Sequence, residues 1–215
     1  MYEKGNKKES ANFIVTGTGT AIADFDYAIF TATAQAHGKT SREAKNKAKE
    51  SIDALQKLLD RWSQDGIIHE IVTFFEVNPF WVHSGHSRTQ DGYAAEYTLR
   101  FTTRKLAEVD SIHDALTEAG ENISVLSPEY RLDNLKKYES QALDAAWLDA
   151  IAQMKHQCAL ASRTESKLES KICWWNVAGN EVWHGKSERS GAVKIVAGKA
   201  HIKATVHIGF LLDFA

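Results

Sequence analysis

The sequence is short of the residues that mark disulfide-linked, metal-binding and membrane-spanning proteins. It has two cysteines, Cys158 and Cys173, and two prolines in 215 residues. The cysteines form neither a Cys-x-x-Cys pair nor a zinc-ligand spacing, which argues against metal and redox sites and predicts two free thiols. No run of about 18 apolar residues occurs, so we expect no membrane span.

The N-terminus lacks an apolar stretch of the kind a signal peptide needs. Residues 1–11 are mostly polar and charged, and we expect a flexible tail there. The sequence therefore shows no sign of export and mildly favours a reduced, cytoplasmic compartment. A mature form that has lost its leader would look the same, which leaves the compartment open.

The charge balance is close to even. Lys and Arg number 26 and Asp and Glu 28, giving a net charge of −2 and a pI near 6.5. Such a chain has no net attraction for phosphate backbones or anionic lipid, so nucleic acid is not an expected partner. Hydrophobic residues make up 43% of the chain and charged residues 25%, which is typical of a folded protein with a sizeable core.

Hydrophobic periodicity divides the N-terminal half into strands and helices. Period-two alternation predicts a half-buried strand over Tyr27–His37, after a first strand over Phe13–Thr20. Hydroxyl caps at Thr40 and Ser41 precede apolar residues spaced three or four apart, which predict an amphipathic helix that ends near Gly66.

A long hairpin is predicted next. The stretch Ile67–Val82 is rich in β-branched and aromatic residues, and Tyr93–Thr102 alternates between apolar and polar side chains. We expect a turn at Ser84–Gln90 between them. One face of this hairpin should belong to the core and the other to solvent.

The C-terminal half continues with two helices and further strands. The pattern predicts a helix over Leu106–Ala119, a strand over Ile123–Leu132 and the longest helix from Leu135 through Cys158. Weaker strands follow at Lys171–Val177 and Glu181–His184, separated by a turn. The final strand, Ala200–Phe210, is longer than the usual 3–10 residues, so something must pair with its whole length.

The predicted order is ββαββαβα followed by two or three strands. This is an α+β fold with mixed or antiparallel sheets and three helices, and without an internal linker we expect residues 12–215 to form a single domain. The residues expected in its core are Ile52, Leu55, Leu59, Leu99, Phe101, Ile112, Leu116, Ile202, Val206 and Ile208.

Two short motifs have both a chemical and a structural interpretation. Gly17-Thr18-Gly19 could bind a phosphate, but no third glycine and no helix follow, so we favour glycines tolerated at a strand end or bulge. His83, His86 and Asp91 could ligate a metal of a hydrolase or a small-molecule site. Their position in a predicted loop also suits solvated polar residues.

Tryptophans gather in two predicted strand regions. Trp174, Trp175 and Trp183 flank the predicted turn near the C-terminus, while Trp81 and His83 lie in the hairpin. Core packing is the ordinary interpretation of such tryptophans. A subunit contact or an apolar pocket is the alternative, because tryptophan is enriched at interfaces.

The order and spacing of several segments resemble the SIMPL domain family. The resemblance rests on Val15–Gly19, the helix start Thr40–Ala44 and Gly66-Ile67, and it continues through Ala119–Asn122 to Ala197-Gly198. It spans nearly the whole chain. The chain departs from the family pattern at Phe25-Asp26, at Lys105-Leu106 and in the third helix, at Leu143 and Gln153, which suggests a divergent member.

The resemblance implies an α+β fold whose function resides in its surfaces. The family has no agreed reaction, catalytic residues or cofactor. Its bacterial members are mostly exported to the periplasm or outer membrane and are linked to envelope integrity or stress, some of them form ring-like oligomers, and an animal relative is a kinase-binding adaptor. We therefore expect a non-enzymatic assembly or binding protein, homo-oligomeric through its hairpin or strand edges or bound to another protein, periplasmic if a leader has been removed. A closed ring is expected because open head-to-tail contacts make filaments.

Overall fold

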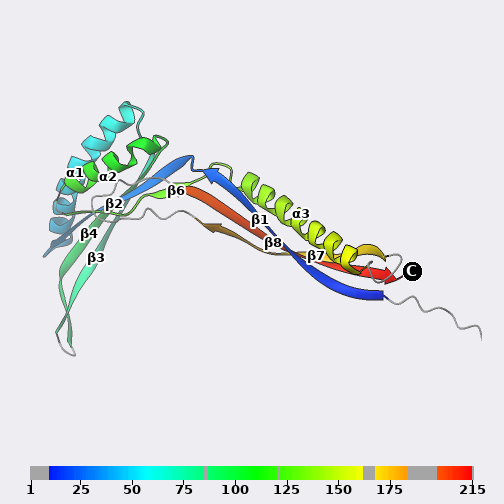
Figure 1. The fold of residues 1–215 in the computed structure, drawn as a ribbon. Coiled ribbons are helices and arrows are strands. Elements are labelled where there is room, and N and C mark those ends of the chain that lie inside the picture. The colour runs from blue at the N-terminus through cyan, green and yellow to red at the C-terminus, as the bar shows by residue number, and fades with distance from the viewer. Residues whose placement is uncertain (1–9, 85–86, 121, 162–167, 184–197, 215) are drawn as a thin grey trace, which may run out of the picture. The chain divides into compact units, whose positions relative to one another are not determined.

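The structure is a computed structural model that describes residues 10–84, 87–120, 122–161, 168–183 and 198–214. The predicted α+β class and the approximate order of elements are confirmed, and the strands pair antiparallel (Figure 1). The elements are β1 Ser10–Asp24, β2 Tyr27–Gly38, α1 Ser41–Gln64, β3 His69–Ser84, β4 Ser87–Thr103, the 3-10 turn η1 Leu106–Glu108, α2 Val109–Glu118, β5 Ile123–Val125, β6 Glu129–Arg131, α3 Leu135–Ala161, β7 Leu168–Trp183 and β8 Lys199–Phe214.

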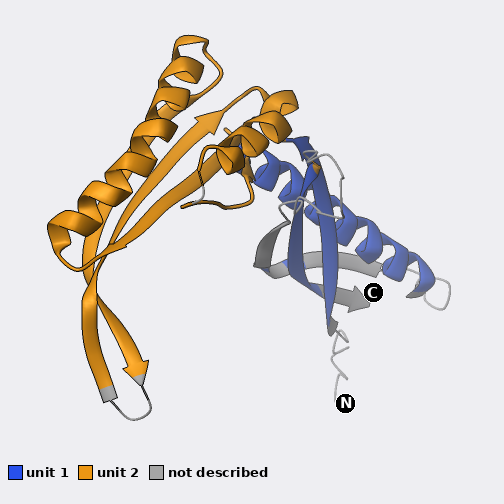
Figure 2. Ribbon diagram, turned by 90° about the vertical axis from the view of Figure 1, so that its left-hand side faces the viewer, with its two compact units in different colours: residues 1–24, 134–184, 199–215 blue, residues 25–133, 185–198 orange. Residues whose placement is uncertain are grey.

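The chain divides into two compact units, shown in two colours in Figure 2. Unit 1 comprises residues 1–24, 134–184 and 199–215, and unit 2 comprises residues 25–133 and 185–198. The sequence contained no linker at these boundaries and predicted one domain over residues 12–215. That the two units fold as one domain stays a prediction, which a single cooperative unfolding transition would support.

Unit 1 is a three-stranded antiparallel sheet in the order β1-β8-β7, with α3 against one face. β8 is the central strand, paired with β1 on one side and β7 on the other. The prediction that the last strand must be paired over its whole length is therefore confirmed, and β8 cannot offer a free edge for assembly.

Gly17 and Gly19 let α3 approach the sheet closely. They lie in the middle of β1, whose register with β8 is unbroken, and not at a strand end or bulge as predicted. A Cβ atom at Gly17 would lie 2.6 Å from the Ala150 backbone nitrogen, and one at Gly19 would lie 2.8 Å from the Ala145 carbonyl carbon. The helix faces them with buried alanines, Ala142, Ala146 and Ala150.

Unit 2 is a sheet in the order β3-β4-β2-β5, with β6 also paired to β2. α1 packs on β2 and β4 through its buried face, Ala44, Ala48, Ile52, Leu55 and Leu59. Its predicted N-cap is confirmed, because the Glu43 backbone N–H donates to Thr40 Oγ1 at 3.2 Å. Within unit 2, none of the described helices packs on the opposite face of this sheet (Figure 2).

The hairpin and two other strand regions differ from the prediction. β3 and β4 pair as far as Ser84 and Ser87, so His83 and Asp91 lie in strands and not in a loop. The expected strand Ile123–Leu132 is two short strands around Pro128, which has no N–H to donate.

The expected turn at residues 178–180 is absent. β7 instead runs through it as one strand and takes up the extra residue in a register shift between Val177 and Gly179.

All ten predicted core residues are buried, with Ile52 the most exposed of them at 6%. The apolar pattern that predicted the third helix, which runs through Leu135, Tyr138, Ala142, Ala145 and Leu148, marks its buried face only in part. Leu148 is 68% exposed, and the buried stripe consists of Ala142, Ala146, Ala150 and Met154. Small residues occupy the stripe because the helix lies so close to the strand backbone.

Candidate interaction surface

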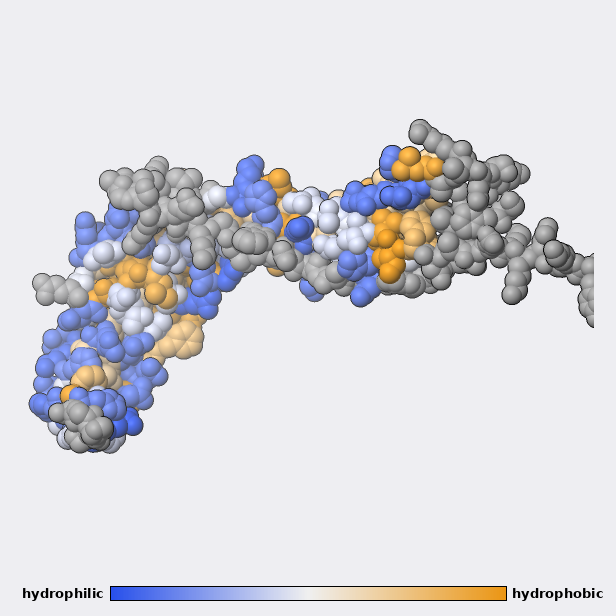
Figure 3. All heavy atoms as spheres, turned by 60° about the horizontal axis from the view of Figure 1, so that its bottom comes forward, coloured by the Kyte–Doolittle hydropathy of each residue, from blue (hydrophilic) through white to orange (hydrophobic). Residues whose placement is uncertain are grey.

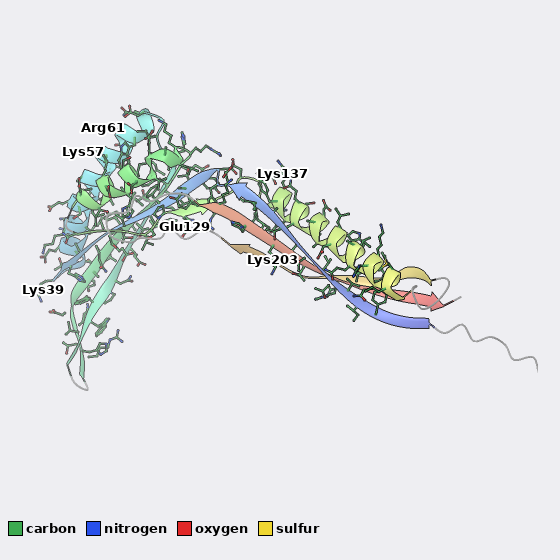
Figure 4. All side chains as sticks on the ribbon, viewed as in Figure 1. Lys39, Lys57, Arg61, Glu129, Lys137 and Lys203 are labelled. Carbon is green, nitrogen blue, oxygen red and sulfur yellow. The ribbon has the colours of Figure 1, made fainter. Side chains whose placement is uncertain are left out.

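The β3–β4 hairpin continues beyond the part of the sheet that α1 covers (Figure 2). Two contacts fix its base. Lys39, just before α1 (Figure 4), donates from Nζ to Asp91 Oδ1 at 2.6 Å. The Phe80 ring packs edge-on against His37, with ring centroids 4.4 Å apart. The Asp91 hydrogen bond raises the pKa of Lys39.

Apolar side chains are exposed along β3 in two groups. Val72 and Phe74, 47% and 58% exposed, lie on the sheet face opposite α1, because the intervening Thr73 pairs with the buried Leu99. Phe80, Trp81 and Val82, each about 40% exposed, begin at the base of the hairpin and continue toward its tip. Orange patches accordingly interrupt the blue surface of this unit, at the left of Figure 3.

β3 is also an edge strand of its sheet. No described residue hydrogen-bonds the outer backbone edge of its segment from Val72 to His83. Unpaired backbone groups on a long, apolar edge favour association with another strand or chain. β1 of unit 1 differs, because the Thr18 N–H donates to Asp149 Oδ2 at 2.9 Å and Gln153 donates to the Thr16 carbonyl at 3.2 Å.

Two adjoining hollows lie on the open face of unit 2. One, of about 300 Å³, is lined mainly by apolar residues, and the other, of about 360 Å³, is more polar. They share Tyr27, Glu70 and Thr102 as walls. The apolar hollow adds chiefly Ile29, Val72, Phe74 and Arg100, and the polar one adds His69, Arg104 and Asp133.

The polar hollow is held by an ion pair. The guanidinium of Arg104 donates two hydrogen bonds to Asp133, at 2.7 and 3.1 Å, and this hydrogen bonding holds the pKa of Asp133 below its usual range. The Asp133 backbone N–H in turn donates to Asp26 Oδ2 at 2.8 Å. Two of the five guanidinium N–H groups of Arg104 are thus engaged within the chain.

Glu70 has an unusual backbone. Its φ of 54° is the one positive value among the described non-glycine residues, and it lies where the β3–β4 register shifts between His69 and Val72. Such conformations persist only where the surroundings impose them, and they gather at binding sites. No motif in the sequence pointed to Glu70.

The residues of the metal hypothesis lie on the same hairpin but do not converge. His83 faces Arg88 across the strands, while Asp91 lies three residues farther along, roughly 10 Å at 3.3 Å per residue, and is bound to Lys39. His86 lies outside the described residues. Within the described part of the chain no cluster of three His, Cys, Asp or Glu side chains could hold a metal.

Of the tryptophans predicted to form an interface, the structure describes the side chain of Trp81. Trp81 is 39% exposed, with the Arg88 guanidinium 4.5 Å from its ring centre. The strand backbone at Trp174, Trp175 and Trp183 belongs to β7, but their side chains lie outside the described residues, as does that of Cys173. Cys158 is a free thiol beside Met154.

None of the described helices has the length and apolar character needed to cross a bilayer.

No curated protein matches the chain. One family model does, the SIMPL protein family of unknown function (DUF541), over residues 13–210. Because the match covers nearly all of the sequence, this chain belongs to the SIMPL family.

Proposed function

We propose that this protein is a non-enzymatic assembly protein that forms closed homo-oligomers through the β3–β4 hairpin. One observation carries the proposal: a long edge strand, with no described partner on its outer backbone, displays six exposed apolar side chains. They are Val72, Phe74, Phe75, Phe80, Trp81 and Val82. Protein contacts favour such surfaces, because association removes apolar area from water and satisfies the free edge.

The chemistry of the described residues agrees with this proposal. Two charged groups of the polar hollow, Arg104 and Asp133, are paired with each other within the chain. The carboxylate of Asp91, a member of the metal hypothesis, is bound to Lys39. These contacts stabilise the hairpin base and the sheet and do not present a reactive group.

Light scattering on the purified full-length chain tests the proposal. We expect a mass of several chains at micromolar concentration that falls toward one chain across a hundredfold dilution. The double variant Trp81→Ser/Val82→Ser, which leaves the Phe80–His37 contact in place, should dissociate at higher concentration than the wild type. Leu126→Ser is the matched control, since Leu126 is 59% exposed but lies outside the hairpin.

A clean monomer mass at every concentration would refute the homo-oligomer. Equal dissociation of the hairpin variant and the Leu126→Ser control would instead show that the chains associate through another surface.

A further inference from the structure

The open face of the unit 2 sheet carries an apolar hollow between two unpaired charges of opposite sign. Arg100 and Glu70 both line it, and neither forms an ion pair with another described residue. Val72 lies directly opposite Arg100 and two residues beyond Glu70, and Phe74 follows Val72 on the same face. The exposed Val72 and Phe74 of β3 thus share one surface with Glu70 of β3 and Arg100 of β4.

Strand register explains why these side chains share one face. Val72 pairs with Arg100 and Phe74 with Thr98, so all four alternate with the buried Leu99 and point away from α1. Strand pairing within the sheet, and not a mobile loop, fixes the positions of these four side chains.

Glu70 joins this face because of the bulge. Thr102 Oγ1 donates to the His69 carbonyl at 3.2 Å, and Thr103 Oγ1 donates to the Ile67 carbonyl at 2.7 Å. These hydrogen bonds hold the backbone on the N-terminal side of Glu70. Glu70 itself has a positive φ, and it lines the same hollow as Val72. A strained conformation maintained in this way is typical of a binding position.

The pattern of charge and apolar area is self-complementary. A singly charged ligand would satisfy either Arg100 or Glu70 and leave the other unpaired. A second copy turned by a two-fold axis would bring its Glu70 to Arg100 and its Arg100 to Glu70, with the apolar side chains packed between.

We propose that two copies of this chain dock face to face through this hollow, with reciprocal Arg100–Glu70 ion pairs around Val72 and Phe74. This inference rests on the proposed homo-oligomer and names one of its contacts. Farther along this face, Glu76 and Glu96 lie directly opposite each other on β3 and β4. We place the two-fold axis nearer Val72, because this position keeps the carboxylates of Glu76 and Glu96 at the rim of the contact.

Charge reversal tests the contact in the full-length chain. Arg100→Glu places two carboxylates together at each ion pair, and Glu70→Lys places two cations together. Each single variant should raise the dissociation constant measured by sedimentation by about tenfold or more. A mixture of the two variants, and the double variant, should return close to the wild-type value because each restores opposite charges.

Lys57→Glu is the control for a change in net charge, since Lys57 is exposed on α1 and away from this face (Figure 4). Circular dichroism must show the same thermal transition for every variant, and Arg100→Gln serves in place of Arg100→Glu if that variant is unstable.

The results of this experiment can refute the face-to-face contact without refuting the proposed assembly role. A wild-type oligomer that neither single variant weakens, or that the mixture fails to restore, would overturn the face-to-face contact and leave the proposed assembly role standing. A wild-type monomer at every concentration would overturn both.

Discussion

Adding one methyl group at Gly17 should separate α3 from its sheet. The Cβ of Gly17→Ala would lie 2.6 Å from the Ala150 nitrogen and 2.7 Å from the Ala150 Cβ, and closer still to the Ala146 carbonyl oxygen. Ordinary contacts of this kind are about 3.4–4 Å, so the helix must retreat by roughly 1 Å. Two of these three neighbours are backbone atoms, which cannot rotate away.

The retreat costs packing along the whole interface. A gap of about 1 Å removes up to half of the dispersion energy of each contact it opens, and the stripe Ala142, Ala146 and Ala150 has no long side chain to fill it. We expect a loss of about 3 kcal/mol in the free energy of unfolding, at the upper end for overpacked positions. The melting temperature should fall by roughly 6–12 °C.

Urea unfolding followed by circular dichroism measures this loss, and Gly198→Ala is the matched control. A Cβ at Gly198 meets nothing within 4 Å, and its φ is not positive, so the control should change stability by less than about 0.5 kcal/mol. Equal stability of the two variants, or a loss below about 1 kcal/mol for Gly17→Ala, would refute the close-packing argument.

Three further predictions concern the core, the thiols and the acid response. Leu55→Ala and Leu99→Ala should each cost about 2–5 kcal/mol in urea unfolding, since both side chains are fully buried; losses below about 1 kcal/mol at both would contradict the burial. Cys158 and Cys173 should both react with a thiol reagent after unfolding without reductant, whereas a lack of reaction at both would indicate a disulfide. The pKa of Asp133 is lowered in the folded state, so its stabilisation is present above the unfolded pKa of about 3.9 and is lost as pH falls through the lower folded value. The urea midpoint of Asp133→Asn should therefore depend less on pH below about pH 4 than that of the wild type, and a pH profile identical to the wild type would refute this.

The fold class and core could be predicted because periodicity reports directly on burial. The stripe Leu55 and Leu59 in α1 and the alternation around Leu99 in β4 each have one face that only a core can accept. What periodicity does not report is strand partnership. β1 and β2 are separated by Phe25 and Asp26 alone, yet they belong to different sheets, because β1 pairs with the distant β8.

The candidate surface was only partly predictable, for a related reason. The sequence indicated a hairpin with Trp81 as a possible contact. It did not indicate that Glu70 takes a positive φ at a bulge, since no glycine or asparagine marks the position. It also placed His83 and Asp91 in a loop, because the polar residues between them carry no strand pattern although their backbones pair as far as Ser84.

α3 closes part of one exposed edge in unit 1, whereas α1 does not close the β3 edge of unit 2. In unit 1, α3 covers one face of the sheet, and its Asp149 and Gln153 also bond the backbone of β1 at Thr18 and Thr16, so two backbone groups of this edge strand are occupied within the chain. In unit 2, α1 covers β2 and β4, but no described side chain reaches the outer backbone of β3 beyond its bulge. If neither edge served as a binding surface, we would expect both to be covered within the chain, because an exposed apolar strand edge promotes pairing with other chains. The open edge adjoins the face that carries Val72 and Phe74, so we expect association to bury edge and face together.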